Sequence, residues 1–204
     1  MASLRAANDA CQRQIRAELD PDERLLWVGQ PKPGIWLRPS DAFLIPFALF
    51  FFGFAVFWEG AAFYAALQQE EPNWIGWLFP FFGLPFLLGG LYLLVGRLLV
   101  DARRRAKTCY GLTDRRIIIL TPGLFGGRQV QSLDLATLGK ITLTERANGY
   151  GTITFGTEFD WLMRHRAWGA FYPFYLPPMF EMIPDARQVY NLIRRQQQEA
   201  RPGR

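Results

Sequence analysis

The chain is poor in the residues from which metal centres and hydrolytic sites are built. Its 204 residues include one histidine, His165, and two cysteines, Cys11 and Cys109, which lie far apart in the sequence. No cysteine or histidine has a neighbour at metal-ligand spacing, and His165 has no adjacent carboxylate to orient it. The sequence therefore predicts no metal site, no disulfide, no cofactor and no enzyme activity.

The N-terminus lacks the pattern of a secretory signal. Residues 1–19 mix charges of both signs and contain no apolar core region, so we expect the first apolar segment to be retained in the mature protein. Residues 3–19 are predicted to form a short polar helix, followed by a strand within residues 19–31 in which Trp27 is a packing anchor.

Charge is almost absent from two long stretches. Residues 74–96 run for 23 residues without a charged side chain, and residues 42–67 contain one, Glu59. At about 1.5 Å per residue, each stretch is long enough as a helix to cross the roughly 30 Å hydrocarbon layer of a membrane. We predict a transmembrane hairpin over residues 42–99, with spans at about 42–67 and 74–97. Gly83, Gly89 and Gly90 allow close approach, either of one span to the other or of the hairpin to a partner's helix.

Basic residues flank the hairpin at its start and at its end, whereas the linker between the two spans has none. Lys32 and Arg38 precede it, Arg97 and the Arg103–Lys107 cluster follow it, and the linker 68–73 carries only negative charge. The positive-inside rule then places both termini in the cytoplasm. We expect a multi-pass protein of the bacterial inner membrane.

Glu59 has two interpretations. A carboxylate within a span is typical of a proton or ion relay, which would suit a small transporter or channel component. Alternatively, Glu59 lies close enough to the outer headgroups to reach water. No second acid, histidine or lysine within the spans completes a pathway, which favours the second interpretation.

Residues 100–204 are predicted to form a water-soluble domain, preceded by a cytoplasmic N-terminal segment over residues 1–41. The region from Asp101 to the C-terminus holds 16 basic and 9 acidic side chains, which suits the anionic surface of the cytoplasmic leaflet. Antiparallel strands are predicted by alternating apolar and polar residues in the stretches 130–135, 141–144 and 152–156, and by the unbroken apolar run 117–120. Residues 108–112 and 180–183 are also predicted to be short strands. A helix follows from Pro184, and residues 196–204 are expected to be a frayed tail.

Several of these segments together resemble a known family. The sequence DERLLWxGQP at 22–31, YxLTDRRI at 110–117, GxGTITFG at 149–156 and FxxIxDxxxVYxLI at 180–193 is similar to bacterial membrane proteins that carry a pleckstrin-homology-like (PH-like) domain. The resemblance covers roughly residues 21–195. It implies an α+β membrane protein in which a two-helix hairpin is followed by a PH-like antiparallel β-barrel or bent sheet with a C-terminal helix, and it implies no enzyme.

Residues 157–179 depart from that pattern because aromatic and basic side chains alternate there. They could dip into headgroups, dock on a partner protein, or fold back over the open end of the sheet. The candidate membrane or partner contacts are Arg103, Arg104, Arg105, Lys107, Arg115, Arg116, Trp161, Arg164, Arg166, Trp168, Phe171, Tyr172, Phe174 and Tyr175. Arg115 and Arg116 could hold a phosphate headgroup, or pair with Asp101, Asp114 or Asp134.

Three functions fit these features. The first is a non-catalytic scaffold or accessory subunit that binds other membrane proteins. The second is a sensor of anionic phospholipid headgroups, and the least favoured is a transporter or channel component built on Glu59. Nucleic acid is not an expected partner, because the basic residues are scattered and match no nucleic-acid-binding module.

Overall fold

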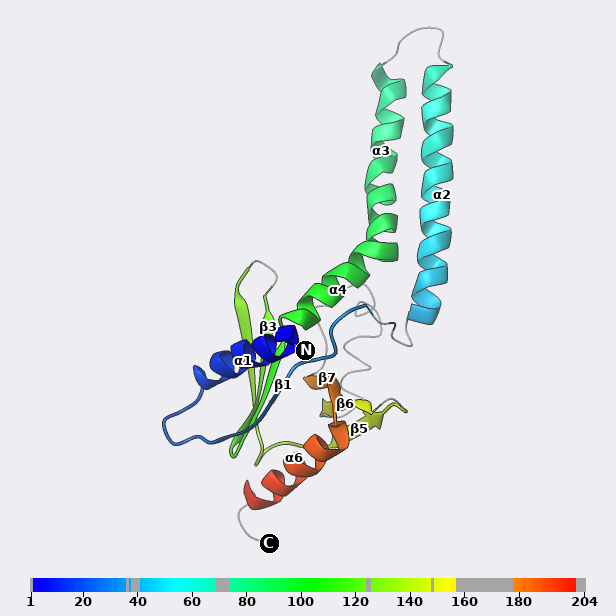
Figure 1. Ribbon diagram of the computed structural model, residues 1–204. Helices are drawn as coiled ribbons and strands as arrows, with labels where there is room; N and C mark the ends of the chain where they lie inside the picture. The colour runs from blue at the N-terminus through cyan, green and yellow to red at the C-terminus, as the bar shows by residue number, and fades with distance from the viewer. Residues whose placement is uncertain are drawn as a thin grey trace. The chain divides into compact units, whose positions relative to one another are not determined.

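The computed structural model describes residues 2–35, 37, 41–68, 74–123, 126–147, 149–156 and 178–200. The chain divides into two compact units (Figure 1). Unit 1 comprises Met1–Gly34 and Ala102–Arg204, and unit 2 comprises Ile35–Asp101. The N-terminal segment therefore belongs to the same unit as the C-terminal domain, although the hairpin separates them in the sequence.

Unit 2 is an antiparallel pair of long helices. Helix α2 spans Asp41–Leu67 and α3 spans Trp74–Leu91, which agrees closely with the predicted spans. A π-helical turn, η1 (Tyr92–Gly96), leads from α3 into α4 (Arg97–Ala106). Both α2 and the run from Gly76 to Ala106 are long and apolar enough to cross a membrane. The helix after η1 continues to Ala106, past residue 100, where the soluble domain was expected to begin.

Small residues let α2 and α3 approach each other. Ala48 and Ala55 are buried on α2, and a Cβ atom at Gly90 would lie 3.0 Å from the Cα atom of Phe52. Gly83 likewise faces α2, whereas a Cβ atom at Gly89 would meet nothing within 4 Å. Packing of one span on the other is therefore confirmed for Gly83 and Gly90 and is wrong for Gly89, for which packing on a partner's helix stays a prediction.

Unit 1 contains two antiparallel sheets. The first has the order β1 (Leu25–Gly29), β2 (Cys109–Thr113), β3 (Arg116–Pro122) and β4 (Arg128–Asp134). The second has the order β5 (Ile141–Glu145), β6 (Tyr150–Phe155) and β7 (Met179–Pro184). The prediction of short antiparallel strands is confirmed, but the strands that the structure describes form two open sheets rather than a closed barrel. Because β1 pairs with β2, the segments before and after the hairpin share one sheet.

The main core lies between the two sheets and the C-terminal helix α6 (Ala186–Ala200). Phe180 is fully buried, and its ring centroid lies 4.7 Å from that of Tyr110, 5.1 Å from that of Phe155 and 5.4 Å from that of Trp27. Trp27 therefore has the packing role predicted for it. Val189 and Ile193 of α6 complete the core.

Helix α6 is longer than the sequence suggested. The expected frayed tail from Gln196 is wrong as far as Ala200, because the helix continues to that residue. Gln197 is buried and donates a hydrogen bond of 2.6 Å to the carbonyl oxygen of Leu138. A polar side chain can be buried when a hydrogen-bond acceptor lies within reach. The spacing of apolar residues along the sequence does not reveal that acceptor.

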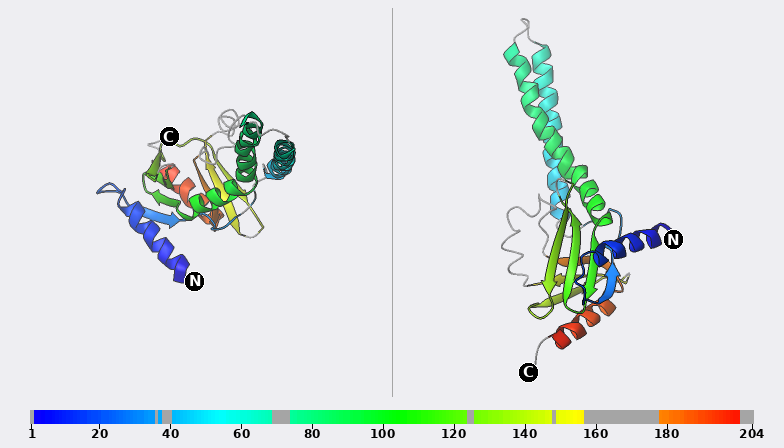
Figure 2. Two further views of the ribbon diagram at one scale, coloured as in Figure 1. Left: turned by 90° about the horizontal axis from the view of Figure 1, so that it is seen from above. Right: turned by 90° about the vertical axis from the view of Figure 1, so that its left-hand side faces the viewer.

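Helix α1 (Ala2–Arg16) packs against β1 and β2 on the face of the first sheet that points away from the main core (Figure 2). Its Cys11 and Ile15 contact Cys109, Ile118 and Leu120, so β3 is buried on both faces, as the unbroken run Ile117–Leu120 predicted. A disulfide joins Cys11 to Cys109, across 98 residues of sequence. The prediction of no disulfide was wrong, because sequence separation does not reveal that β2 returns beside α1.

Candidate functional site

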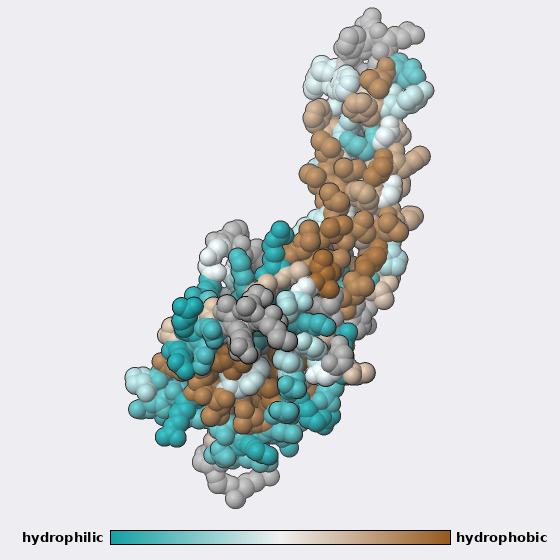
Figure 3. Space-filling view, viewed as in Figure 1, coloured by the Kyte–Doolittle hydropathy of each residue, from teal (hydrophilic) through white to brown (hydrophobic). Residues whose placement is uncertain are grey.

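The most prominent surface of unit 2 is its apolar exterior, which Figure 3 shows along the length of the hairpin. On α2, five phenylalanines recur at alternating spacings of four and three, and their exposed fractions lie between 41% and 76%: Phe43, Phe47, Phe50, Phe54 and Phe57. We call them the phenylalanine ridge. At 3.6 residues per turn they share one helix face, away from the face on which Ala48 and Ala55 meet α3. The spacing is visible in the sequence, but the sequence analysis did not identify it.

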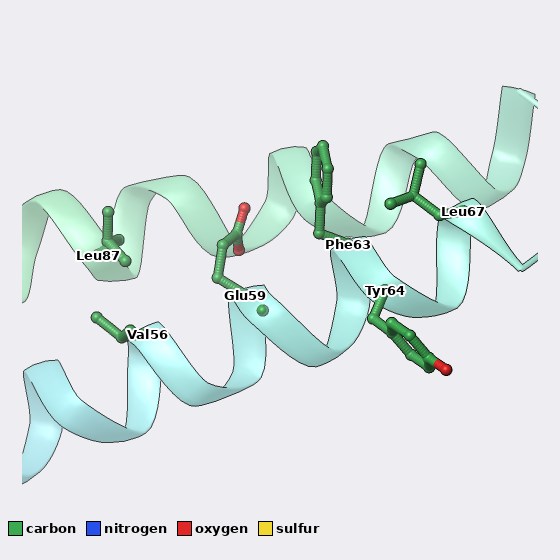
Figure 4. Close-up of a pocket in the computed structure, with 7 residues that line it drawn as sticks. Val56, Glu59, Phe63, Tyr64, Leu67 and Leu87 are labelled. Carbon is green, nitrogen blue, oxygen red and sulfur yellow. The ribbon is translucent and has the colours of Figure 1, made fainter.

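Glu59 lies between the two helices of unit 2 (Figure 4). Its Oε2 atom is buried directly against Gly83, where a Cβ atom would lie 1.8 Å from that oxygen. Within the described part of the chain, Oε2 has no hydrogen-bond partner. Any larger residue at position 83 would displace this carboxyl group from the helix interface.

A shallow hollow of about 470 Å³ lies beside Glu59. It is lined by Val56, Glu59, Gly60, Phe63, Tyr64, Leu67 and Leu87. Glu59 and Tyr64 supply its polar atoms among otherwise apolar side chains. Such a surface can accommodate an apolar group with a hydrogen-bonding atom, but its lining includes no second carboxylate and no histidine, lysine or arginine.

A buried ion pair joins the start of the first helix of the hairpin to the helix that follows the second. Asp41, the first residue of α2, accepts a hydrogen bond from the guanidinium of Arg97, the first residue of α4. Asp41 is 2% exposed and Arg97 is 7% exposed. The first span was predicted to begin at about residue 42, and the structure shows that the charge of Asp41 just before it is matched by Arg97 of α4.

The basic cluster on α4 does not act as one surface. Arg103 and Lys107 are exposed and Arg104 is half-buried, whereas Arg105 is buried. Arg105 donates a hydrogen bond of 3.0 Å to the carbonyl oxygen of Gly34, and its Nη1 lies 3.9 Å from Oε1 of Glu181. Arg105 therefore serves the interior of unit 1.

Tyr110 belongs to the same buried region of unit 1. The backbone N–H of Glu181 donates a hydrogen bond of 3.1 Å to its hydroxyl oxygen. Burial raises the pKa of the Tyr110 phenol well above its usual range, so this side chain is neutral at physiological pH. It acts as a packing residue with one satisfied polar atom.

Arg116 is held by acidic residues of the N-terminal segment. Its guanidinium lies 2.7 Å from Oε2 of Glu23 and 3.3 Å from Oδ2 of Asp20, and it also donates to the carbonyl oxygen of Glu18. Burial alone would raise the pKa of Glu23, but hydrogen bonds from Arg116, the Asp20 amide and Thr113 outweigh it and lower this pKa to about 2. Asp101, Asp114 and Asp134 had been considered as partners, and the sequence analysis missed Glu23.

Arg115 is exposed but lies far from the α4 cluster. Strand β2 runs from Cys109 to Thr113 between the two, and five extended residues span roughly 16 Å. One phosphate headgroup cannot bridge this distance. The structure thus separates Arg115 and Arg116 from Arg103 and Lys107.

The other predicted contact residues lie outside the described residues. They are Trp161, Arg164, Arg166, Trp168, Phe171, Tyr172, Phe174 and Tyr175. Across the part of the chain that is described, no group of three His, Cys, Asp or Glu side chains is arranged to hold a metal ion. Comparison of the chain with known protein families, with curated proteins and with solved structures found no match.

Proposed function

We propose that this chain is an integral protein of the bacterial inner membrane that acts without catalysis, as a PH-like scaffold or accessory subunit for other membrane proteins. In this proposal both termini lie in the cytoplasm and unit 2 spans the bilayer. The observation that carries the proposal is the phenylalanine ridge, an ordered apolar face on a helix long enough to cross a membrane.

The exposed surface of unit 2 supports the placement in a bilayer. Large apolar side chains project outward all along both helices, and examples are Phe50, Phe57, Phe82 and Leu88 at 63% to 76% exposure. Water would order around such a surface at a large free-energy cost, which a hydrocarbon environment removes. The basic residues on both flanks of the hairpin support the orientation.

The spacing of the ridge supports a protein partner in addition to lipid. Acyl chains cover any apolar surface and require no register. Alternating spacings of three and four residues are what a second helix needs for side chains to interdigitate along a shared seam. The ridge occupies the face of α2 that α3 leaves uncovered, so a further helix can pack there without disturbing the hairpin.

Two of the segments that suggested a PH-like domain meet in unit 1, which supports that part of the proposal. The backbone N–H of Arg24 donates a hydrogen bond of 3.0 Å to Oδ1 of Asp114, and the N–H of Asp114 donates one of 3.1 Å to the carbonyl oxygen of Arg24. Glu23 and Arg116 pair beside them. The N-terminal segment is therefore part of the domain that the hairpin would hold at the membrane.

Anionic headgroups are a second candidate ligand, favoured by the exposure of Arg103 and Lys107. Each such charge near an anionic leaflet contributes about 1 kcal/mol of attraction. Arg105 and Arg116 make their contacts within unit 1, which leaves a weak, diffuse attraction rather than a headgroup site.

The test is site-specific photocrosslinking of the full-length protein in cells. Benzoylphenylalanine replaces Phe50 or Phe54 on the ridge, and the matched control replaces Leu49, which is 60% exposed at the same depth of α2 but on another face. We expect one membrane protein to be crosslinked from both ridge positions and not from Leu49. Equal crosslinking from all three positions, or crosslinks to lipid alone, would contradict the proposal.

Raising the salt concentration distinguishes binding of a partner protein from binding of anionic headgroups. A helix interface within the bilayer is not screened, so the crosslinked partner should also co-purify in mild detergent at high ionic strength. Attraction to headgroups through Arg103 and Lys107 weakens as the Debye length falls. Loss of all association at high salt would favour the headgroup candidate.

A further inference from the structure

The two cysteines of the chain form one bridge between the N-terminal helix and the first sheet. Cys11 lies on α1 and Cys109 begins β2, with their Cα atoms 5.6 Å apart. Both are buried, at 1% and 3% exposure. The bridge closes a loop that includes β1, the whole of unit 2 and α4, and it ties α1 to the sheet in which β1 and β2 already pair.

Among the side chains that the structure describes, Ile15 and Leu19 also hold α1 and the residues after it against the sheet. Ile15 is fully buried over Gly111, where a Cβ atom would lie 2.7 Å from the Cγ2 atom of Ile15. Leu19, just beyond the helix, adds a partly buried contact. A helix of 15 residues is marginal in water without packing, so its position depends on its contacts with the sheet.

Departure of α1 would uncover a continuous apolar face. Ile118 and Leu120 on β3, and the partly buried Leu25 and Val28 on β1, pack beneath Cys11 and Ile15. They point away from the main core, which lies on the opposite face of the same sheet. The core can therefore stay intact while this second face opens.

We propose that Cys11 and Cys109 form a thiol–disulfide switch that locks α1 onto the first sheet when oxidised and releases it when reduced. Its biological setting rests on the cytoplasmic placement in the proposed function, because disulfides in that compartment are usually transient and redox-sensing. The chemistry itself requires only the two cysteines and a thiol–disulfide couple.

Glutathione is a sufficient partner for both directions. In reduction, a glutathione thiolate attacks one sulfur of the bridge, forms a mixed disulfide and expels the other cysteine as a thiolate, which takes up a proton. A second glutathione thiolate attacks the mixed disulfide, and glutathione disulfide leaves with the second cysteine freed as a thiolate. Oxidation reverses these steps, so two protein thiols and one glutathione disulfide give the bridge and two glutathione molecules. Because the bridge is buried, attack occurs when α1 opens locally.

The purified full-length protein in lipid nanodiscs provides the test. It is equilibrated in glutathione buffers of increasing disulfide content, and the bridge is quantified by maleimide mass-tagging. Hydrogen exchange of the α1 amides is compared with that of Ile117–Ile119 in β3. We expect the bridge to titrate within the buffer series, and α1 exchange to rise at least tenfold on reduction while β3 exchange is unchanged.

Three results would overturn the switch. The bridge could fail to form at any glutathione ratio, it could resist reduction by excess glutathione, or α1 could exchange equally in both forms. Because no partner protein is present in the assay, each result is independent of whether the scaffold proposal holds.

Two variants sharpen the test. Cys11→Ser should match the reduced protein under all buffers. Ile15→Ala keeps both cysteines but weakens the docking of α1, which lowers the effective concentration of one thiol near the other. Its titration should therefore require more glutathione disulfide than the wild type, and an unchanged midpoint would show that α1 docking and the bridge are not coupled.

Discussion

Glu23 and Arg116 form a two-point ion pair between segments that lie on either side of the hairpin in the sequence. Oε1 of Glu23 accepts a hydrogen bond of 2.8 Å from Nε of Arg116, and Oε2 accepts one of 2.7 Å from Nη2. Thr113 also donates to Oε1, at 2.7 Å. The Glu23 side chain is fully buried, so these bonds fix the N-terminal segment to the turn between β2 and β3.

The first prediction concerns the acid sensitivity of this pair. The pKa of Glu23 is about 2 in the folded protein and 4.5 in the reference state, so its contribution to stability is complete above pH 4.5 and is lost as the pH falls toward 2. A difference of this size corresponds to on the order of 3 kcal/mol. Glu23→Gln should cost about that much at pH 7, and the gap to wild type should narrow below pH 4.5.

Hydrogen exchange of β2 and β3 amides measures this effect within unit 1. Asp20→Asn is the matched control, because Asp20 also contacts Arg116 but its side chain is 64% exposed, and it should cost less than about 1 kcal/mol. A gap between wild type and Glu23→Gln that stays constant from pH 7 to pH 2.5 would contradict the assignment.

The second prediction separates structural from surface arginines on α4. Arg105→Ala leaves the Gly34 carbonyl and Glu181 without this partner and should destabilise unit 1 by about 2–4 kcal/mol. Arg103→Ala, two residues earlier and exposed, should change stability by less than about 0.5 kcal/mol. Thermal unfolding in nanodiscs reports stability. Equal losses in the two variants would show that burial of Arg105 does not determine its role.

The third prediction uses neighbouring glycines of α3. A leucine at Gly90 would collide with the backbone of Phe52, whereas one at Gly89 projects into open space. Gly90→Leu should therefore separate α2 from α3, and Gly89→Leu should not. Cysteines are placed at Ala55 and Leu87, which the contacts of Phe52 with Gly90 and of Glu59 with Gly83 put at the same level of the hairpin, in an otherwise cysteine-free chain. Crosslinking between them should be slow in the first variant only. Slow crosslinking in both variants would mean that the helix face has been assigned wrongly.

Most of the helices and strands follow from local patterns. The two apolar runs predicted α2 and α3 because their length and lack of charge are properties of the segments themselves. The strands were predicted for the same reason, because the alternation of apolar and polar residues and the residues of the turns are also properties of each segment. The end of α6 was missed because Gln197 owes its place to the distant Leu138 carbonyl.

Long-range pairings account for the rest of what sequence reasoning missed. Nothing in the spacing of Cys11 and Cys109 indicates that α1 lies against β2, and nothing in the turn at Arg116 points to Glu23, 93 residues away. Charge alone grouped Arg105 with Arg103, although helix geometry turns one inward and the other to solvent. Site predictions based on residue type therefore overestimated the exposed basic surface.

The last prediction concerns the buried pair of Asp41 and Arg97 in unit 2. Removing one partner leaves a buried charge uncompensated, which typically costs 3–5 kcal/mol, whereas replacing both with apolar residues of similar size is often nearly neutral. Asp41→Leu should therefore destabilise the hairpin strongly, and the double variant Asp41→Leu/Arg97→Met should recover most of that loss. Thermal unfolding in nanodiscs, followed by helical circular dichroism, gives the three stabilities. If the double variant is as unstable as the single one, the pair contributes through specific hydrogen bonding at the helix ends rather than through mutual neutralisation of two buried charges.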